Sequence, residues 1–175
     1  MSDHPLDEWV RATAPRAVAY ARSLLRNPHD AEEIVQDCYG RLIAKADVYD
    51  LPRDGMKLLL TSISNACLNL KSRRRTFFRL VRSDDDETFD DPPDRSTAKP
   101  EETASGNELA AAVAIALRKL PVQQRAAIEL KSLGHSQQEI GEILNVTSNN
   151  AGVLVHRARQ ALAEMLAPFL EREDA

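Results

Sequence analysis

The sequence is poor in the residues and motifs that would mark an enzyme or a metalloprotein. It contains two cysteines in 175 residues, and Cys38 and Cys67 form no C-x-x-C pair. Each falls on an apolar helical stripe, so we interpret both as core thiols rather than redox or metal groups. No two histidines have metal-ligand spacing, and the chain lacks a phosphate loop or a nucleophile elbow. We therefore expect no catalytic residue, no metal and no cofactor.

Long apolar runs are also lacking, although 43% of the residues are hydrophobic. No stretch reaches the length needed to span a bilayer, which predicts no membrane insertion. Residues 1–5 have neither the basic nor the apolar segment of a signal peptide, so we expect a cytoplasmic protein. The sequence also has almost no alternating strand pattern, and helical periodicity predominates. The predicted fold class is all-α.

The net charge of −4 is unusual for a nucleic-acid-binding protein, but the charge is unevenly distributed. Residues 1–82 carry 14 basic and 10 acidic side chains, whereas residues 83–104 carry 2 and 9. Residues 105–175 carry 7 and 8. The middle segment is polar, acidic and proline-bearing, and such a composition does not bury enough apolar surface to fold alone. We predict two helical domains, 1–82 and 105–175, joined by a flexible acidic linker at 83–104.

Three apolar stripes with helical spacing predict three helices in the first domain. Their members are Ala14, Ala17, Val18, Ala21, Leu24 and Leu25; Val35, Cys38, Tyr39, Leu42, Ile43 and Ala46; and Met56, Leu59, Leu60, Ile63, Cys67 and Leu70. Asn27 and Pro28 are typical of a helix cap and first position. Pro15 is unfavourable inside a helix and predicts a break or a new start after Thr13.

In the second domain, a stripe through Leu109 and Leu120 predicts a further helix. Pro121 is expected to open the next one, which ends at Gly134. Ser136 and Glu139 form a capping-box pattern, which predicts that another helix starts there. Because proline disfavours continuation, we expect the last helix to end before Pro168.

The segment after Ser136 has the pattern of a helix-turn-helix. Ile140, Ile143 and Leu144 form an apolar face, and Gly141 leaves room for a second helix. Asn145 tolerates the left-handed conformation of a turn. After it, Val146 is expected to fill the corner between the two helices, and Thr147 or Ser148 to cap the second helix. This unit places its second helix in a DNA major groove, so the pattern indicates a DNA-binding protein.

Five segments in order resemble the motifs of one family. Residues 30–37 resemble DAED-x-VQ, and residues 65–75 resemble RN…D-x-x-R-R. Residues 120–125, 138–141 and 156–159 resemble LP-x-x-x-R, EIA and RAR. Outside the predicted linker, nearly the whole chain is similar to the extracytoplasmic-function (ECF) sigma factors of bacterial RNA polymerase. The resemblance implies a non-enzymatic alternative sigma factor whose partners are core polymerase, promoter DNA and an anti-sigma factor.

By this resemblance, the polar face of the second helix binds a coiled coil of core polymerase. Its members are Glu32, Glu33, Gln36, Asp37 and Arg41. An acidic face that meets a basic partner is plausible electrostatic complementarity. A solvated helix face is the alternative interpretation.

The third helix carries a polar stripe that runs into basic residues, and the resemblance assigns it to the −10 promoter element. The residues are Asn65, Asn69, Ser72, Lys71, Arg73, Arg74 and Arg75. Asparagine presents a donor and an acceptor to a base edge, and arginine binds phosphate. Tyr49, in the preceding loop, is a candidate to hold a flipped base, or it is a simple loop anchor.

The last helix departs from the family pattern, because Gly152 and Leu154 stand where Lys and Arg are usual. The remaining candidates for the −35 element are Thr147, Ser148, Asn149, Asn150, His156, Arg157 and Arg159. The two missing basic groups and the apolar run 153–155 leave a second hypothesis open. In that hypothesis the chain is a sigma-like interaction protein that binds an anti-sigma factor without productive DNA recognition. An ordinary helix-turn-helix repressor is a further alternative, but it leaves the first domain unexplained.

Overall fold

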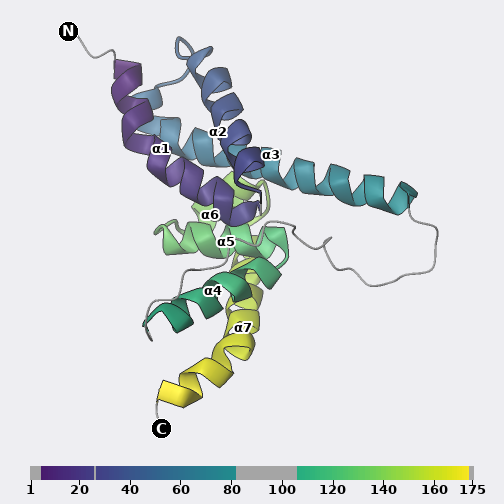
Figure 1. Ribbon diagram of the computed structural model, residues 1–175. Helices are drawn as coiled ribbons and strands as arrows, with labels where there is room; N and C mark the ends of the chain where they lie inside the picture. Colours follow the sequence, from purple (N-terminus) through teal and green to yellow (C-terminus); the bar gives the residue numbers. More distant parts are fainter. Residues whose placement is uncertain (1–4, 26, 82–105, 174–175) are drawn as a thin grey trace. The chain divides into compact units, whose positions relative to one another are not determined.

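The computed structural model describes residues 5–25, 27–81 and 106–173, with the backbone alone for 75–81, 106–107 and 170–173. The chain separates into two compact units, Met1–Thr97 and Ala98–Ala175. The described residues contain seven helices and no strand, which confirms the all-α prediction (Figure 1). The linker predicted at 83–104 lies outside the described residues.

The first unit is a three-helix cluster of α1 (Pro5–Leu24), α2 (Pro28–Ile43) and α3 (Leu51–Val81), in which each helix packs against the other two. Asn27 caps α2 as predicted: its Oδ1 accepts a hydrogen bond from the His29 amide at 2.9 Å. The expected stripes supply most of the core, including both cysteines. Ile43 is the exception, because it is the last residue of α2 and is exposed.

The prediction of a break at Pro15 was wrong, since α1 is continuous from Pro5 to Leu24. Proline removes one main-chain hydrogen bond, which would have reached the Arg11 carbonyl. Both Arg11 and Pro15 are exposed, so water can satisfy that carbonyl. The same correction applies to the C-terminal helix, because α7 runs past Pro168 to Glu173. Pro168 is also exposed.

Trp9, which lies outside the predicted stripes, and Tyr39, which belongs to the second stripe, complete the first core. The Trp9 and Tyr39 rings meet edge to face, with centroids 5.2 Å apart and planes at 70°. Thr13 Oγ1 donates to the Trp9 carbonyl at 2.7 Å, so the Tyr39 hydroxyl, 2.7 Å away, donates to Thr13. Trp9 also lies against Gly55 of α3, where an added Cβ would come within 2.7 Å of the indole ring. The absence of a side chain at Gly55 therefore allows α3 to lie close to α1.

The second unit consists of α4 (Gly106–Lys119), α5 (Val122–Ser132), α6 (Gln137–Leu144) and α7 (Ser148–Glu173). α7 packs against the other three helices. Arg125 of α5 is buried, and its Nη2 donates to the carbonyls of Arg118 and Leu120 at 3.1 and 2.9 Å. It thus satisfies carbonyls at the end of α4, which would otherwise lack donors. The arginine of the LP-x-x-x-R segment is a structural residue.

Two glycine substitutions in the first unit test this packing. We expect Gly55→Ala to lower the free energy of unfolding by about 1–3 kcal/mol, because the methyl group overlaps the buried indole. Gly40→Ala is the matched control, since a Cβ there meets nothing within 4 Å. It should leave stability unchanged or raise it by about 0.5–1 kcal/mol. The single tryptophan, Trp9, reports urea unfolding of this unit by fluorescence. Equal midpoints for the two variants would contradict the close approach.

Candidate functional site

The helix-turn-helix forms as the sequence predicts. The Ser136 hydroxyl accepts from the Glu139 amide at 3.2 Å, and the Glu139 carboxylate accepts from the Ser136 amide at 2.7 Å. This reciprocal pair is the predicted capping box and starts α6. Ile140, Ile143 and Leu144 are buried, so α6 presents its apolar face to the rest of the unit.

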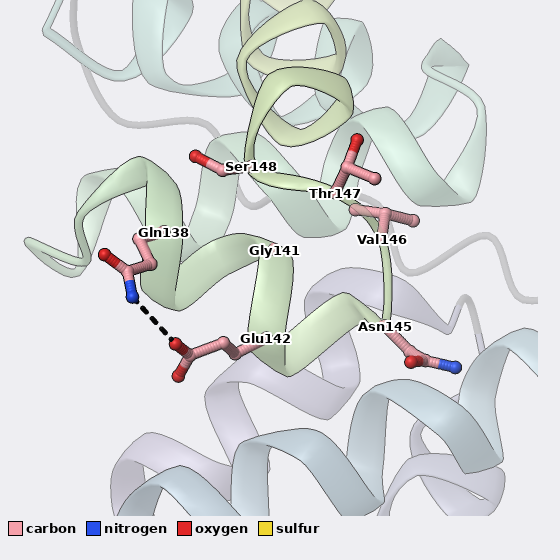
Figure 2. A pocket seen from close by; sticks show the side chains of 7 residues that line it. All are labelled: Gln138, Gly141, Glu142, Asn145, Val146, Thr147 and Ser148. Atoms are coloured by element: carbon pink, nitrogen blue, oxygen red, sulfur yellow. Dashed lines mark hydrogen bonds between the residues drawn. The ribbon is translucent and has the colours of Figure 1, made fainter.

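The turn between the two helices depends on Asn145 and Gly141. Asn145 adopts φ 53° and ψ 47°, the left-handed conformation that asparagine tolerates. A Cβ on Gly141 would lie 2.9 Å from the Val146 carbonyl oxygen and 3.2 Å from the Ser148 nitrogen. Both are main-chain atoms that have little room to yield. Residues of α6, the turn and the start of α7 line a shallow hollow. Figure 2 shows the hydrogen bond between Gln138 and Glu142, which are one turn apart on α6. The donor and acceptor atoms of this bond are 3.2 Å apart.

Two side chains, one just before α7 and one in α6, form hydrogen bonds with the main chain of the first turn of α7. Thr147 Oγ1 accepts from the Asn150 amide at 3.2 Å, so Thr147 is the cap, and its hydroxyl is engaged there. Gln137 of α6 donates to the Ser148 carbonyl at 2.8 Å. A Cβ on Gly152 would lie 2.8 Å from the Gln137 Cδ. Gly152 therefore makes room for the amide that ties α6 to α7.

One face of α7 is buried, and the opposite face is open. Ala151, Leu154, Val155 and Ala158 are buried, with Leu154 8% exposed. Asn149, Val153, His156 and Gln160 lie on the outer face at helical spacing, and Val153 is 38% exposed. Arg157 and Arg159 are exposed on either side of this row, and Ser148 and Asn150 are exposed at its start. Of the apolar run 153–155, only Val153 faces outward. The spacing from Asn149 to His156 could have identified Val153 from sequence.

The polar stripe of α3 is exposed, but the basic residues at its end lie on different sides of the helix. Asn65, Asn69 and Ser72 are exposed on one face, and Arg73 lies one turn beyond Asn69 on the same side. Arg74 lies about half a turn away from that face. Lys71 is half-buried on a different side, and the Arg75 side chain lies outside the described part of the chain.

Arg74 forms an ion pair with α2 instead of joining the polar stripe. Its Nη2 is 2.7 Å from Asp30 Oδ2, across 44 residues of sequence. The Asp30 side chain is only 18% exposed, which protects the pair from part of the solvent screening. Sequence reasoning grouped Arg73, Arg74 and Arg75 because they are consecutive. The helical repeat separates Arg74 from Arg73.

The predicted docking residues of α2 are all exposed: Glu32, Glu33, Gln36, Asp37 and Arg41. Glu32 forms an ion pair with Arg22 of α1. Arg41 donates to the Asp37 carbonyl at 3.3 Å and to Cys38 Sγ at 3.5 Å. A shallow hollow on this face is lined by Gln36, Asp37, Gly40 and Arg41. Gly40 was not among the predicted site residues.

The loop between α2 and α3 carries two outward apolar side chains. Val48 is 70% exposed and Tyr49 is 36% exposed. Asp50 ends the loop, and its carbonyl accepts from the Asp54 amide at 2.8 Å in the first turn of α3. The Tyr49 ring is thus accessible, and it projects from a loop anchored at both ends by helices.

The cysteines are buried in the first core. Burial raises the pKa of the Cys67 thiol to about 12, and it also raises that of Cys38. Both thiols therefore stay protonated and unreactive near neutral pH.

Within the described ranges, no group of three His, Cys, Asp or Glu residues is placed to hold a metal ion. No described helix is both long and apolar enough to cross a bilayer.

Two family models match the chain, one in each unit. The model of sigma-70 region 2 matches residues 9–77, which include α2 and most of α3. The model of sigma-70 region 4 matches residues 111–162, which include the helix-turn-helix.

Curated relatives share this organisation over most of the chain. The ECF RNA polymerase sigma factor SigE of Mycolicibacterium smegmatis is 33% identical over 162 residues, which cover 92% of this chain and 61% of SigE. The ECF RNA polymerase sigma factor SigW of Bacillus subtilis is 28% identical over 147 residues, covering 82% of this chain and 79% of SigW. The chain thus spans less than two thirds of the length of SigE.

A solved structure has the same fold. It is the sigma factor RpoE in complex with the anti-sigma factor NepR from Bartonella quintana. The match has a TM-score of 0.68 at 23% identity and covers 91% of this chain and 95% of that one.

Gly141→Ala tests the geometry of the turn. We expect it to lower the free energy of unfolding of the second unit by about 1–3 kcal/mol, because main-chain atoms surround the added methyl group. Amide hydrogen exchange should accelerate in α6 and the first turn of α7 and stay unchanged in α1 to α3. Glu142→Ala, at the adjacent exposed position, should shift stability by no more than about 0.5 kcal/mol. Unaltered exchange in α6 of Gly141→Ala would refute the role of this contact.

Proposed function

The chain belongs to the extracytoplasmic-function group of the sigma-70 family, and we propose that it directs RNA polymerase to specific promoters and assists their opening. It acts as a non-enzymatic specificity subunit. One observation carries the proposal: a sigma-70 region 2 unit with an exposed asparagine stripe is followed, in one chain, by a region 4 helix-turn-helix with an open polar face on α7.

The −10 element is bound by the outer face of α3. Asn65 and Asn69 can read base edges, and Ser72 and Arg73 extend that face toward phosphates. Lys71 and Arg75 add positive charge near the same helix. Tyr49, on its exposed loop, stacks on a base displaced from the duplex. Arg74 contributes indirectly, since its ion pair with Asp30 ties α3 to α2.

The −35 element is bound by the first three turns of α7. Asn149 and His156 face outward and present hydrogen-bonding groups to a major groove. Arg157 and Arg159 flank them and suit the two phosphate backbones that border the groove. Ser148 and Asn150 lie at the helix start, where main-chain amides favour a phosphate, and Thr147 holds that start as its cap. With Leu154 buried and Gly152 packed beside the Gln137 side chain, this contact relies on few basic groups and depends weakly on salt.

Core polymerase docks on the exposed face of α2 formed by Glu32, Glu33, Gln36, Asp37 and Arg41. An anti-sigma factor is a further partner. The fold likeness to a sigma factor solved with an anti-sigma factor supports this, and so does the accessibility of these faces. Because the machinery that the chain serves works on chromosomal DNA, we assign the protein to the cytoplasm.

Reconstituted transcription tests the proposed function. The purified chain, added to bacterial core polymerase and a library of genomic promoter fragments, should start transcription from a small set of fragments that share two spaced elements. Core polymerase alone and a promoterless template are the controls. A chain that binds core polymerase or an anti-sigma factor, yet never starts transcription, would instead establish the interaction-protein alternative.

Arg73 and Arg74 should differ in their contribution to DNA binding. Removing a phosphate contact lowers the slope of log affinity against log salt by about 1. We expect this loss for Arg73→Ala and not for Arg74→Ala, whose guanidinium pairs with Asp30. The measurement is promoter affinity of the polymerase complex over a salt series. Equal reductions in slope for both variants would show that Arg74 leaves Asp30 to contact DNA.

A further inference from the structure

Gly40 lies in the last turn of α2, on the exposed side of the helix, where the protein's own packing does not require a glycine. A Cβ at this position would meet nothing within 4 Å. By contrast, the space beside Gly55 is filled by Trp9, and that beside Gly141 by the main chain of the turn. Glycine inside a helix is less favourable than alanine, so Gly40 costs stability that the fold does not recover.

The missing side chain creates the hollow on α2. Gln36, Asp37 and Arg41 border it, each within about one helical turn of Gly40. The floor is the bare backbone of α2, and the rim offers a carboxamide, a carboxylate and a guanidinium. We call this feature the Gly40 notch. A notch of this kind admits a side chain that approaches more closely than any other residue at position 40 would permit.

Two carboxylates, those of Glu33 and Asp37, lie on the side of α2 that carries the notch, against one guanidinium, that of Arg41, so negative charge exceeds positive charge by one. Glu32 pairs with Arg22, and Asp30 pairs with Arg74, at the two edges of α2. Glu33 and Asp37 lie between them, and in the described ranges neither carboxylate has an ion-pair partner. Arg41 donates to the main-chain oxygen of Asp37 and to Cys38 Sγ instead of to that carboxylate. The complementary occupant is therefore positively charged.

We infer that the Gly40 notch receives a lysine or arginine side chain from core RNA polymerase. The aliphatic stem lies over the Gly40 backbone, and the cationic head reaches Asp37 and Glu33. This inference rests on the proposed docking role of α2, and it adds to that role a specific contact and the chemistry of its partner. It also explains the glycine, because position 40 must stay empty for the stem to lie against the helix.

Gly40 variants separate stability from binding. Gly40→Ala should unfold at the same or a higher urea concentration than the parent chain, yet bind core polymerase several-fold more weakly. Gly40→Leu fills the notch and should weaken binding at least about tenfold, as expected for overpacking of a contact. Ala12→Leu is the matched control, since it adds a leucine to an exposed position of α1 in the same unit. It should bind core polymerase like the parent.

A double-mutant cycle identifies the occupant as cationic. Asp37→Asn should weaken binding and reduce its salt dependence. In Gly40→Leu, the same change should have little further effect, because the basic side chain is already displaced. Full affinity of folded Gly40→Leu for core polymerase would overturn the inference while leaving the proposed function intact. Independent, additive effects would show that no shared side chain occupies the notch. Failure of the parent chain itself to bind core polymerase would instead overturn both proposals.

Discussion

Each helix in these small units can bury only one face, and the apolar stripe decides which face that is. In α2, burial of Ala31, Val35, Cys38 and Leu42 forces the acidic residues outward. In α7, burial of Ala151, Val155 and Ala158 does the same for the row from Asn149 to His156. The hydrophobic effect thus orients the candidate interaction surfaces before any partner is present.

The candidate surfaces are built on close main-chain contacts that specific residues make possible. Gly141 lets the α6 backbone approach the start of α7, and the left-handed Asn145 reverses the chain between them. Gly55 lets Trp9 pack against α3. Gly40 differs from both, because its open side faces solvent. Gly40 therefore lowers the stability of α2 relative to alanine without improving the packing of the unit.

The structure also revises how the basic groups are used. Arg125 lies inside the second unit and caps α4, so it is not available to bind a nucleic acid. Arg74 pairs with Asp30 and links α3 to α2. Of the basic residues predicted to contact DNA, Arg74 is engaged in an ion pair, whereas Arg73, Arg157 and Arg159 are exposed.

Local rules were sufficient for the helices, their caps and the turn, because periodicity, the Ser136–Glu139 box and the left-handed Asn145 depend on neighbours in sequence. The same rules failed at Pro15 and Pro168, because both helices continue through these prolines. Each proline is exposed, so water can replace the lost main-chain hydrogen bond, and the exposure of a residue is known only once the unit has folded. Likewise, only the packed structure could show that Arg74 pairs with Asp30, that Arg125 is buried against the end of α4, and that nothing covers Gly40. These features depend on contacts between residues that are far apart in the sequence. Local sequence patterns do not show which distant residues come into contact.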